Sequence, residues 1–150
     1  MLELDELDLA RADYVRAIDL ATEPELLAIS RYGLAVALER LGDLPSAYDV
    51  LDAANAIRLP SPPYAASDPL ELPEVYFVPA YERSYLEALR SMARARRAQE
   101  GGRKRAVLEQ AAVAWDLYLE GAPDDVPYRK NARAHRKRVA DEIARLPGRD

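Results

Sequence analysis

The chain has 150 residues, of which 49% are hydrophobic and 31% are charged, and its formal net charge is -5. These values are typical of one globular domain, and no apolar run approaches the roughly 18 to 20 residues that a membrane span needs. Because the chain has no cysteine, disulfides, thiolate zinc sites and a cysteine nucleophile are excluded. Cysteine content alone does not fix the cellular compartment.

The charge is unevenly distributed along the chain. Residues 1–60 carry 12 acidic and 5 basic side chains, whereas residues 101–150 carry 8 acidic and 11 basic ones. The N-terminal segment MLELDELDLARADY has no basic leader followed by an apolar core, so we expect no signal peptide and a cytoplasmic protein. If a leader had been removed, the alternative would be a protein of the periplasm or cell envelope that is a fragment of a longer chain.

Apolar residues at steps of three and four predict three helices in the first part of the chain. The first ends near Thr22-Glu23-Pro24, because the residue before a proline is pushed out of the helical region. Its stripe consists of Leu4, Leu7, Ala10, Tyr14, Ala17, Ile18 and Ala21. The second helix runs from about Glu25 to Leu41 and ends at Gly42. The third starts near Leu44, tolerates Pro45 in its first turn and extends to Ile57.

Residues 59–73, LPSPPYAASDPLELP, show no period and predict an irregular connection. The apolar patch 75–78 follows, and we expect it to fold back onto the core; docking of a partner is the alternative. Three more helices are predicted: one from Pro79 to Ala98 that Gly101-Gly102 end, one from Arg103 to Glu120, and one that runs to about Leu146. Asp124 or Asp125 is expected to cap the last, with Pro127 in its first turn. The predicted fold is all-α, with about six helices and no strand.

Residues 28–61 combine a helix, a Gly-Asp turn, a second helix and a closing proline, as one unit of a helical array does. The segment resembles a tetratricopeptide repeat (TPR), and the departure is Arg31, where the family favours a large aromatic residue that Tyr32 could replace. The matching positions are Leu34-Ala35, Leu38, Gly42-Asp43-Leu44, Ala47, Leu51, Ala54 and Pro60.

Two weaker matches flank this unit. Ala10, Tyr14 and Ala17-Ile18 match the second helix of a preceding repeat whose first helix is missing, and Ala111, Trp115, Tyr118 and Pro123 match the second helix of a following one. The resemblance implies a right-handed solenoid of helical hairpins that forms a single TPR-like domain over residues 1–150. Residues 59–79 would be an irregular insert, and the last helix would be a solvent-facing cap.

The resemblance also implies a function: a non-catalytic scaffold that binds a peptide or protein segment in a concave groove lined by the first helix of each hairpin. The groove candidates are Ile29, Tyr32, Val36, Glu39, Arg40, Tyr81 and Tyr85. Family members that clamp a carboxylate use Lys and Asn where this chain has Tyr32 and Val36, so we expect no carboxylate clamp.

The alternative function is that of a structural subunit in a homo-oligomer or a larger cell-envelope assembly. The first helix lacks its hairpin partner, so its apolar stripe has nothing local to cover it and could pack on another chain. The candidate partner patch comprises Leu4, Leu7, Val75, Tyr76 and Phe77.

The residues offer little catalytic or cofactor chemistry. His135 is the only histidine and without cysteine cannot build a common zinc site, so we expect a surface histidine on a solvated helix. No phosphate-binding loop or nucleophile motif is present, and we expect no enzyme activity, cofactor or metal. Basic side chains could contact the phosphate groups along a nucleic-acid backbone, and two basic segments are present, Arg90 to Arg105 and Arg129 to Arg138. Because the chain is acidic overall, we expect a solvated face or a protein-binding surface instead of a nucleic-acid site.

Overall fold

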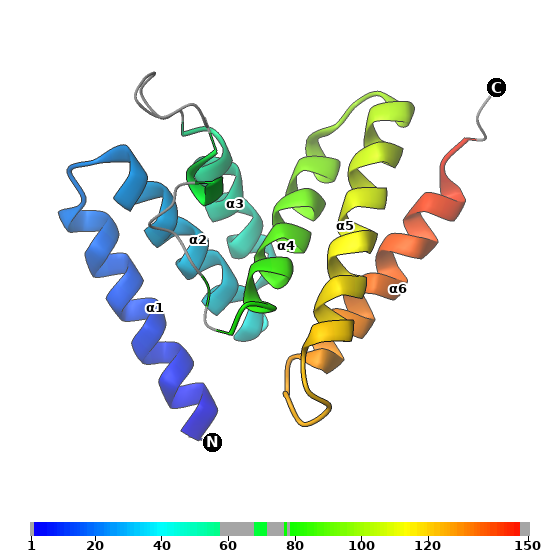
Figure 1. Ribbon diagram of the computed structural model, residues 1–150. Helices are drawn as coiled ribbons and strands as arrows, with labels where there is room; N and C mark the ends of the chain where they lie inside the picture. Colours follow the sequence, from blue (N-terminus) through cyan, green and yellow to red (C-terminus); the bar gives the residue numbers. More distant parts are fainter. Residues whose placement is uncertain (1, 58–67, 72–76, 78, 148–150) are drawn as a thin grey trace. The chain divides into compact units, whose positions relative to one another are not determined.

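The computed structural model describes residues 2–57, 68–71, 77 and 79–147 (Figure 1). Within these ranges the chain forms six α-helices and one 3-10 helix, and no strand, which confirms the predicted all-α class. The α-helices are α1 (Leu2–Leu20), α2 (Pro24–Arg40), α3 (Leu44–Asn55), α4 (Glu82–Arg97), α5 (Gly101–Gly121) and α6 (Arg129–Arg145), and the 3-10 helix is η1 (Pro69–Glu71).

The helices pack mainly as antiparallel pairs that follow one another in the chain. α2 contacts both α1 and α3, and α5 contacts both α4 and α6 (Figure 1). The residues form two compact units, Met1–Tyr76 and Phe77–Asp150, which we call the N-terminal and C-terminal units and describe separately. The single TPR-like domain and the handedness of a solenoid stay predictions.

Small residues set the contact between α2 and α3 in the N-terminal unit. Ala35 on α2, and Ala47 and Ala54 on α3, are 0% exposed. Alanine at a helix crossing lets two helices approach closely, and a bulkier side chain would force them apart. These three positions are the small residues among those that match the repeat family, and all three are buried.

The turn between α2 and α3 is fixed by two residues. Gly42 has φ +92°, a left-handed conformation that only glycine adopts at low cost, so it ends α2 as predicted. Asp43 is the N-cap of α3, and its side chain accepts a hydrogen bond from the backbone N–H of Ser46 at 3.2 Å. This bond satisfies one of the N–H groups that a helix start leaves without an intrahelical partner.

The inner face of α1 lies against α2, which corrects the expectation that nothing local covers the first helix. The ring of Tyr14 occupies the space in which a Cβ at Gly33 would lie. Glycine at this position of α2 therefore leaves room for an aromatic ring at the helix contact. Leu7, Tyr14 and Ile18 are half-buried there, while the side chain of Leu4 lies outside the described residues.

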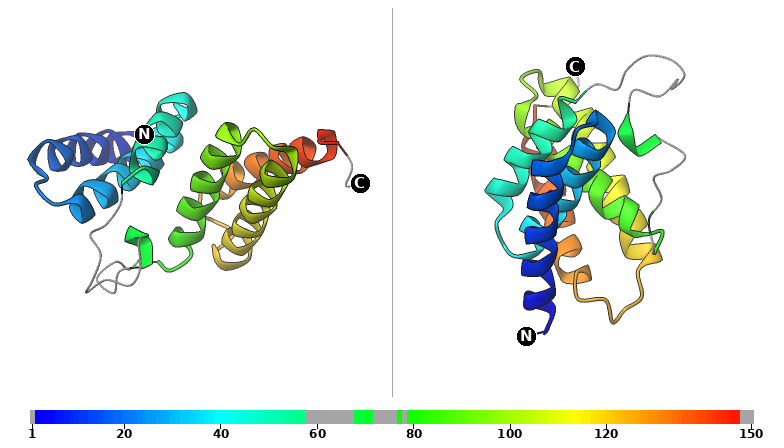
Figure 2. Two further views of the ribbon diagram at one scale, coloured as in Figure 1. Left: turned by 90° about the horizontal axis from the view of Figure 1, so that it is seen from above. Right: turned by 90° about the vertical axis from the view of Figure 1, so that its left-hand side faces the viewer.

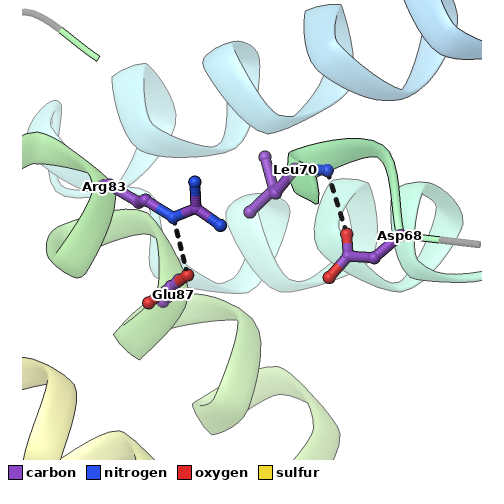
Figure 3. Close-up of polar contacts among 4 residues, drawn as sticks. All are labelled: Asp68, Leu70, Arg83 and Glu87. Atoms are coloured by element: carbon purple, nitrogen blue, oxygen red, sulfur yellow. Dashed lines mark hydrogen bonds and ion pairs between the residues drawn. The ribbon is translucent and has the colours of Figure 1, made fainter. Parts of the chain in front are cut away.

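Part of the predicted irregular connection is a core element. η1 contacts α2, and Leu70 within it is only 2% exposed. The Asp68 side chain accepts a hydrogen bond from the backbone N–H of Leu70 at 3.0 Å (Figure 3), which holds the start of the short helix. Figure 2 shows η1 as one brief turn. A single buried leucine has no period, so pattern analysis could not find it; residues 58–67 lie outside the described part of the chain.

In the C-terminal unit, α4 starts three residues later and α5 two residues earlier than predicted, and their other ends differ by one residue each. The segment from Pro79 to Tyr81 forms a tighter turn before α4, with bonds such as Glu82 N–H to the Pro79 carbonyl at 3.1 Å. Within α4, Arg83 donates to Glu87 one turn later at 3.0 Å (Figure 3). Gly101-Gly102 begin α5 and do not end α4, which stops at Arg97. The first turn of a helix makes few intrahelical N–H bonds, so glycine costs less there than in the interior.

The start of α6 was also predicted too early. Asp124 and Asp125 lie in turns, and the N-cap is Tyr128, without a side-chain cap bond. Pro127 explains the delay, because it disfavours the helical conformation for Val126 before it. The helix therefore begins at Arg129, two residues after the proline.

Candidate binding surfaces

The middle helix of the N-terminal unit presents a partly exposed strip. Ile29, Val36 and Arg40, which we call the α2 strip, are spaced by seven and four residues and so share one face of α2. All three side chains are half-buried. α2 packs on α3 through Tyr32 and on α1 through Gly33, which lies between Ile29 and Val36 at helical spacing, so the strip runs beside the α1 contact and stays partly accessible. It combines two aliphatic side chains with one cation.

The other groove candidates of this unit are internal. Tyr32 is 2% exposed, and its hydroxyl donates a hydrogen bond to Asn55 Oδ1 at 3.0 Å across the α2–α3 contact. Glu39 is buried as well. The resemblance to the repeat family implied a groove position for both, because the first helix of each hairpin lines the groove in that family. One helix in contact with two others has only a narrow face left for solvent, and these two residues fall outside it.

Tyr85 belongs to a cluster of rings in the core of the C-terminal unit. It is 0% exposed and packs edge-to-face on Trp115 and Tyr118, with ring centroids 4.9 Å apart in each pair. Tyr81, half-buried, packs edge-to-face on Tyr118 at 5.6 Å. Such geometry is the favoured one for aromatic pairs. Trp115 and Tyr118, which match the second helix of a repeat, are core residues.

His135 is part of the same core, so the prediction of a surface histidine was wrong. It is 8% exposed, and its ring stacks on that of Trp115 with centroids 5.2 Å apart and an angle of 21°. Trp115 in turn directs its Nε1–H to Met92 Sδ at 3.3 Å. The prediction weighed the basic neighbours of His135 in sequence. Its neighbours on the helix face are Ala132 and Val139, both buried, and they decide its environment.

Three arginines join α5 to α6 and its C-terminal end. Arg129 donates to the carbonyl oxygens of Leu119 and Ala122 at 2.5 and 2.7 Å, at the C-terminal end of α5. Arg136 pairs with Asp116 at 2.9 and 3.3 Å, and Arg105 donates to the Pro147 carbonyl at 3.0 Å. A cation favours the negative end of a helix dipole. Arg129 and Arg136 of the basic run therefore stabilise the fold. No sequence motif predicted this role.

The other basic residues of the two predicted segments differ in their exposure. Arg90 is 5% exposed, so it is no part of a surface stripe. On α4 and α5 the exposed members of the predicted stripe are Arg94, Arg97 and Arg103, with Lys104 and Arg105 half-buried. On α6 the exposed basic residues are Lys130, Arg133, Lys137, Arg138 and Arg145.

The predicted partner patch is described only in part. Leu7 and Phe77 are half-buried, and Val75, Tyr76 and Val78 lie outside the described residues. Large apolar side chains are exposed elsewhere, at Leu9, Val15 and Leu20 on α1, Leu26 on α2, and Val113 and Leu117 on α5. The apolar spacing placed none of these in a predicted patch.

The described residues hold no group of three or more His, Asp or Glu side chains arranged to bind a metal ion. No helix in the same part of the chain is long and apolar enough to cross a membrane. No protein family, curated protein or solved structure was found to match the chain.

Proposed function

We propose that the chain is a non-catalytic, TPR-like module of helical hairpins that binds a protein segment on the α2 strip. The proposal rests mainly on one observation: Ile29, Val36 and Arg40 remain partly accessible on a helix that packs on a neighbour at either side. In the repeat family that the segment 28–61 resembles, this face of the first helix contacts the ligand. The buried alanines of the α2–α3 contact support the same assignment.

The side chains of the α2 strip indicate which class of ligand it would bind. Two aliphatic side chains about one and three turns before a guanidinium suit a segment with an apolar residue and a carboxylate. Burying the apolar residue would provide affinity, and an Arg–carboxylate contact would fix the direction of the segment. Tyr32, where the clamp-bearing members have lysine, is committed to Asn55, so the carboxylate would be recognised by Arg40.

A peptide-library selection against the full chain tests this proposal. We expect enriched peptides to share an apolar residue and an acidic one, and their affinity to fall at least tenfold for Val36→Asp and for Arg40→Glu. Val113→Asp, which places the same charge on an exposed apolar position of α5, is the control and should bind normally. Peptides that bind all three variants equally well would assign recognition to another surface.

A further inference from the structure

The outward side of α1 combines exposed leucines with acidic residues. Leu9 and Leu20 are 66% and 72% exposed, and their separation of 11 residues, about three turns, places them on one line of the helix. Ala12, also exposed, lies between them. Four exposed acidic residues, Glu6, Asp8, Asp13 and Asp19, surround this line, and one exposed cation, Arg16, lies on it, so the face has an acidic excess. We call this set the α1 outer face; the opposite face of α1 lies on α2.

The outward side of α6 has the opposite charge. α6 contains seven basic and two acidic residues, and it packs on α5 through its buried residues Ala132, His135 and Val139. The exposed residues Lys130, Arg133, Lys137, Arg138 and Arg145 form what we call the α6 outer face. One exposed carboxylate, Asp141, lies among them and pairs with Lys137 at 3.5 Å. The exposed residues Ala134 and Ala144 are small enough for another helix to approach.

We propose that chains associate head to tail, with the α1 outer face of one chain on the α6 outer face of a second copy. The two faces have complementary charge, and α1 with six acidic and two basic residues mirrors the excess on α6. Leu9 and Leu20, about 16 Å apart along the helix, would lie on the exposed alanines and on the aliphatic stems of the lysine and arginine side chains. This association uses neither the α2 strip nor the predicted partner patch.

The proposed contact joins two different surfaces, so each chain keeps one free face of each kind. Such a contact produces chains of molecules and not closed dimers unless the rotation closes a ring. Because exposed charges provide much of the attraction, the association is sensitive to salt, whose screening length is about 10 Å at 0.1 M and shorter above it.

Light scattering of the full chain across a concentration series is the first test. We expect the mean molar mass to rise with concentration at about 0.02 M salt and to return to that of the monomer at about 0.5 M, as screening predicts. A wild-type chain that is monomeric at every concentration in both salts would overturn the proposal. If that monomer bound an oligonucleotide and lost it on Lys130→Glu with Lys137→Glu, the α6 outer face would be a polyanion site instead.

Charge reversal identifies the two faces. We expect Asp13→Lys with Asp19→Lys, and separately Lys130→Glu with Lys137→Glu, to leave each protein monomeric, and an equimolar mixture of the two variants to associate. Glu120→Lys with Asp125→Lys changes the net charge as the α1 variant does, at exposed sites outside both faces, and should associate like wild type. Association that survives the α6 reversal but not the α1 reversal would mean a symmetric α1 dimer and contradict the proposal.

Discussion

Gly33 shows how one residue without a side chain decides a helix contact. A Cβ at this position would overlap the ring of Tyr14 from α1. Alanine is better than glycine in a helix by up to about 1 kcal/mol, whereas overpacking costs roughly 1 to 3 kcal/mol. We therefore expect Gly33→Ala to leave the free energy of unfolding unchanged or to lower it by up to about 2 kcal/mol.

The same substitution should reverse its sign when the ring is absent. In a Tyr14→Ala background we expect Gly33→Ala to stabilise the protein by roughly 0.5 to 1 kcal/mol, because only the helix propensity remains. Urea unfolding of the four proteins in this cycle measures the coupling. Equal effects of Gly33→Ala in both backgrounds would show that the ring does not occupy this space.

Arg129 has a structural role that a variant can isolate. Its guanidinium donates to two carbonyl oxygens at the end of α5, and its side chain is only 12% exposed. We expect Arg129→Met, which keeps the length but removes the donors, to lower the free energy of unfolding by roughly 1.5 to 3 kcal/mol. Arg133→Met on the exposed side of the same helix should cost less than about 0.5 kcal/mol. Similar losses of unfolding free energy for both variants would mean that the removed positive charge causes the loss, and not the hydrogen bonds of Arg129.

At the scale of elements, the α2–α3 pair depends on small residues at its crossing. Ala47 is 0% exposed, whereas Ala53 on the same helix faces solvent. We expect Ala47→Leu to destabilise the protein by about 1 to 3 kcal/mol through overpacking, and Ala53→Leu to change its stability by less than about 0.5 kcal/mol. Thermal unfolding followed by circular dichroism measures both. An unchanged melting temperature for Ala47→Leu would contradict the close α2–α3 contact.

The helices themselves were predictable because each buries one continuous stripe. Ala111, Trp115 and Tyr118, which matched the second helix of a repeat, are all buried on α5, and Gly42 identified the end of α2. Helix ends were less predictable where the local rules conflict. Gly101-Gly102 can end one helix or begin the next. Which of the two occurs depends on whether the first backbone N–H groups of the new helix find hydrogen-bond partners, and the sequence does not show this.

The candidate site was predicted only in part for a similar reason. Ile29, Val36 and Arg40 are half-buried and so partly accessible, whereas Tyr32 and Glu39 are buried. Helical spacing says which residues share a face of α2 and leaves open how much of that face a neighbour covers. The contact of Tyr32 with Asn55 joins residues 23 positions apart, and the stack of His135 on Trp115 joins two helices. Such pairs depend on how helices cross and have no local pattern.

At the scale of the whole molecule, the two units have separate sets of buried residues. The C-terminal unit contains the ring cluster around Tyr85 and Trp115, with Leu89, Leu108 and Val139 also buried. Trp115 is the only tryptophan in the chain. Its fluorescence therefore reports on this unit alone, while circular dichroism at helix wavelengths reports on both.

We accordingly expect a fragment of residues 77–150 to fold without the N-terminal unit, although a chain of this size is only marginally stable. Its Trp115 emission maximum should match that of the full chain, and urea should unfold it in one transition. Tyr85→Ala in the fragment removes the ring that contacts both Trp115 and Tyr118, and the loss of a large core side chain costs roughly 3 to 5 kcal/mol, enough to unfold so small a domain. A fragment whose tryptophan emits as in an unfolded chain, with or without Tyr85, would mean that the ring cluster does not form an independent core.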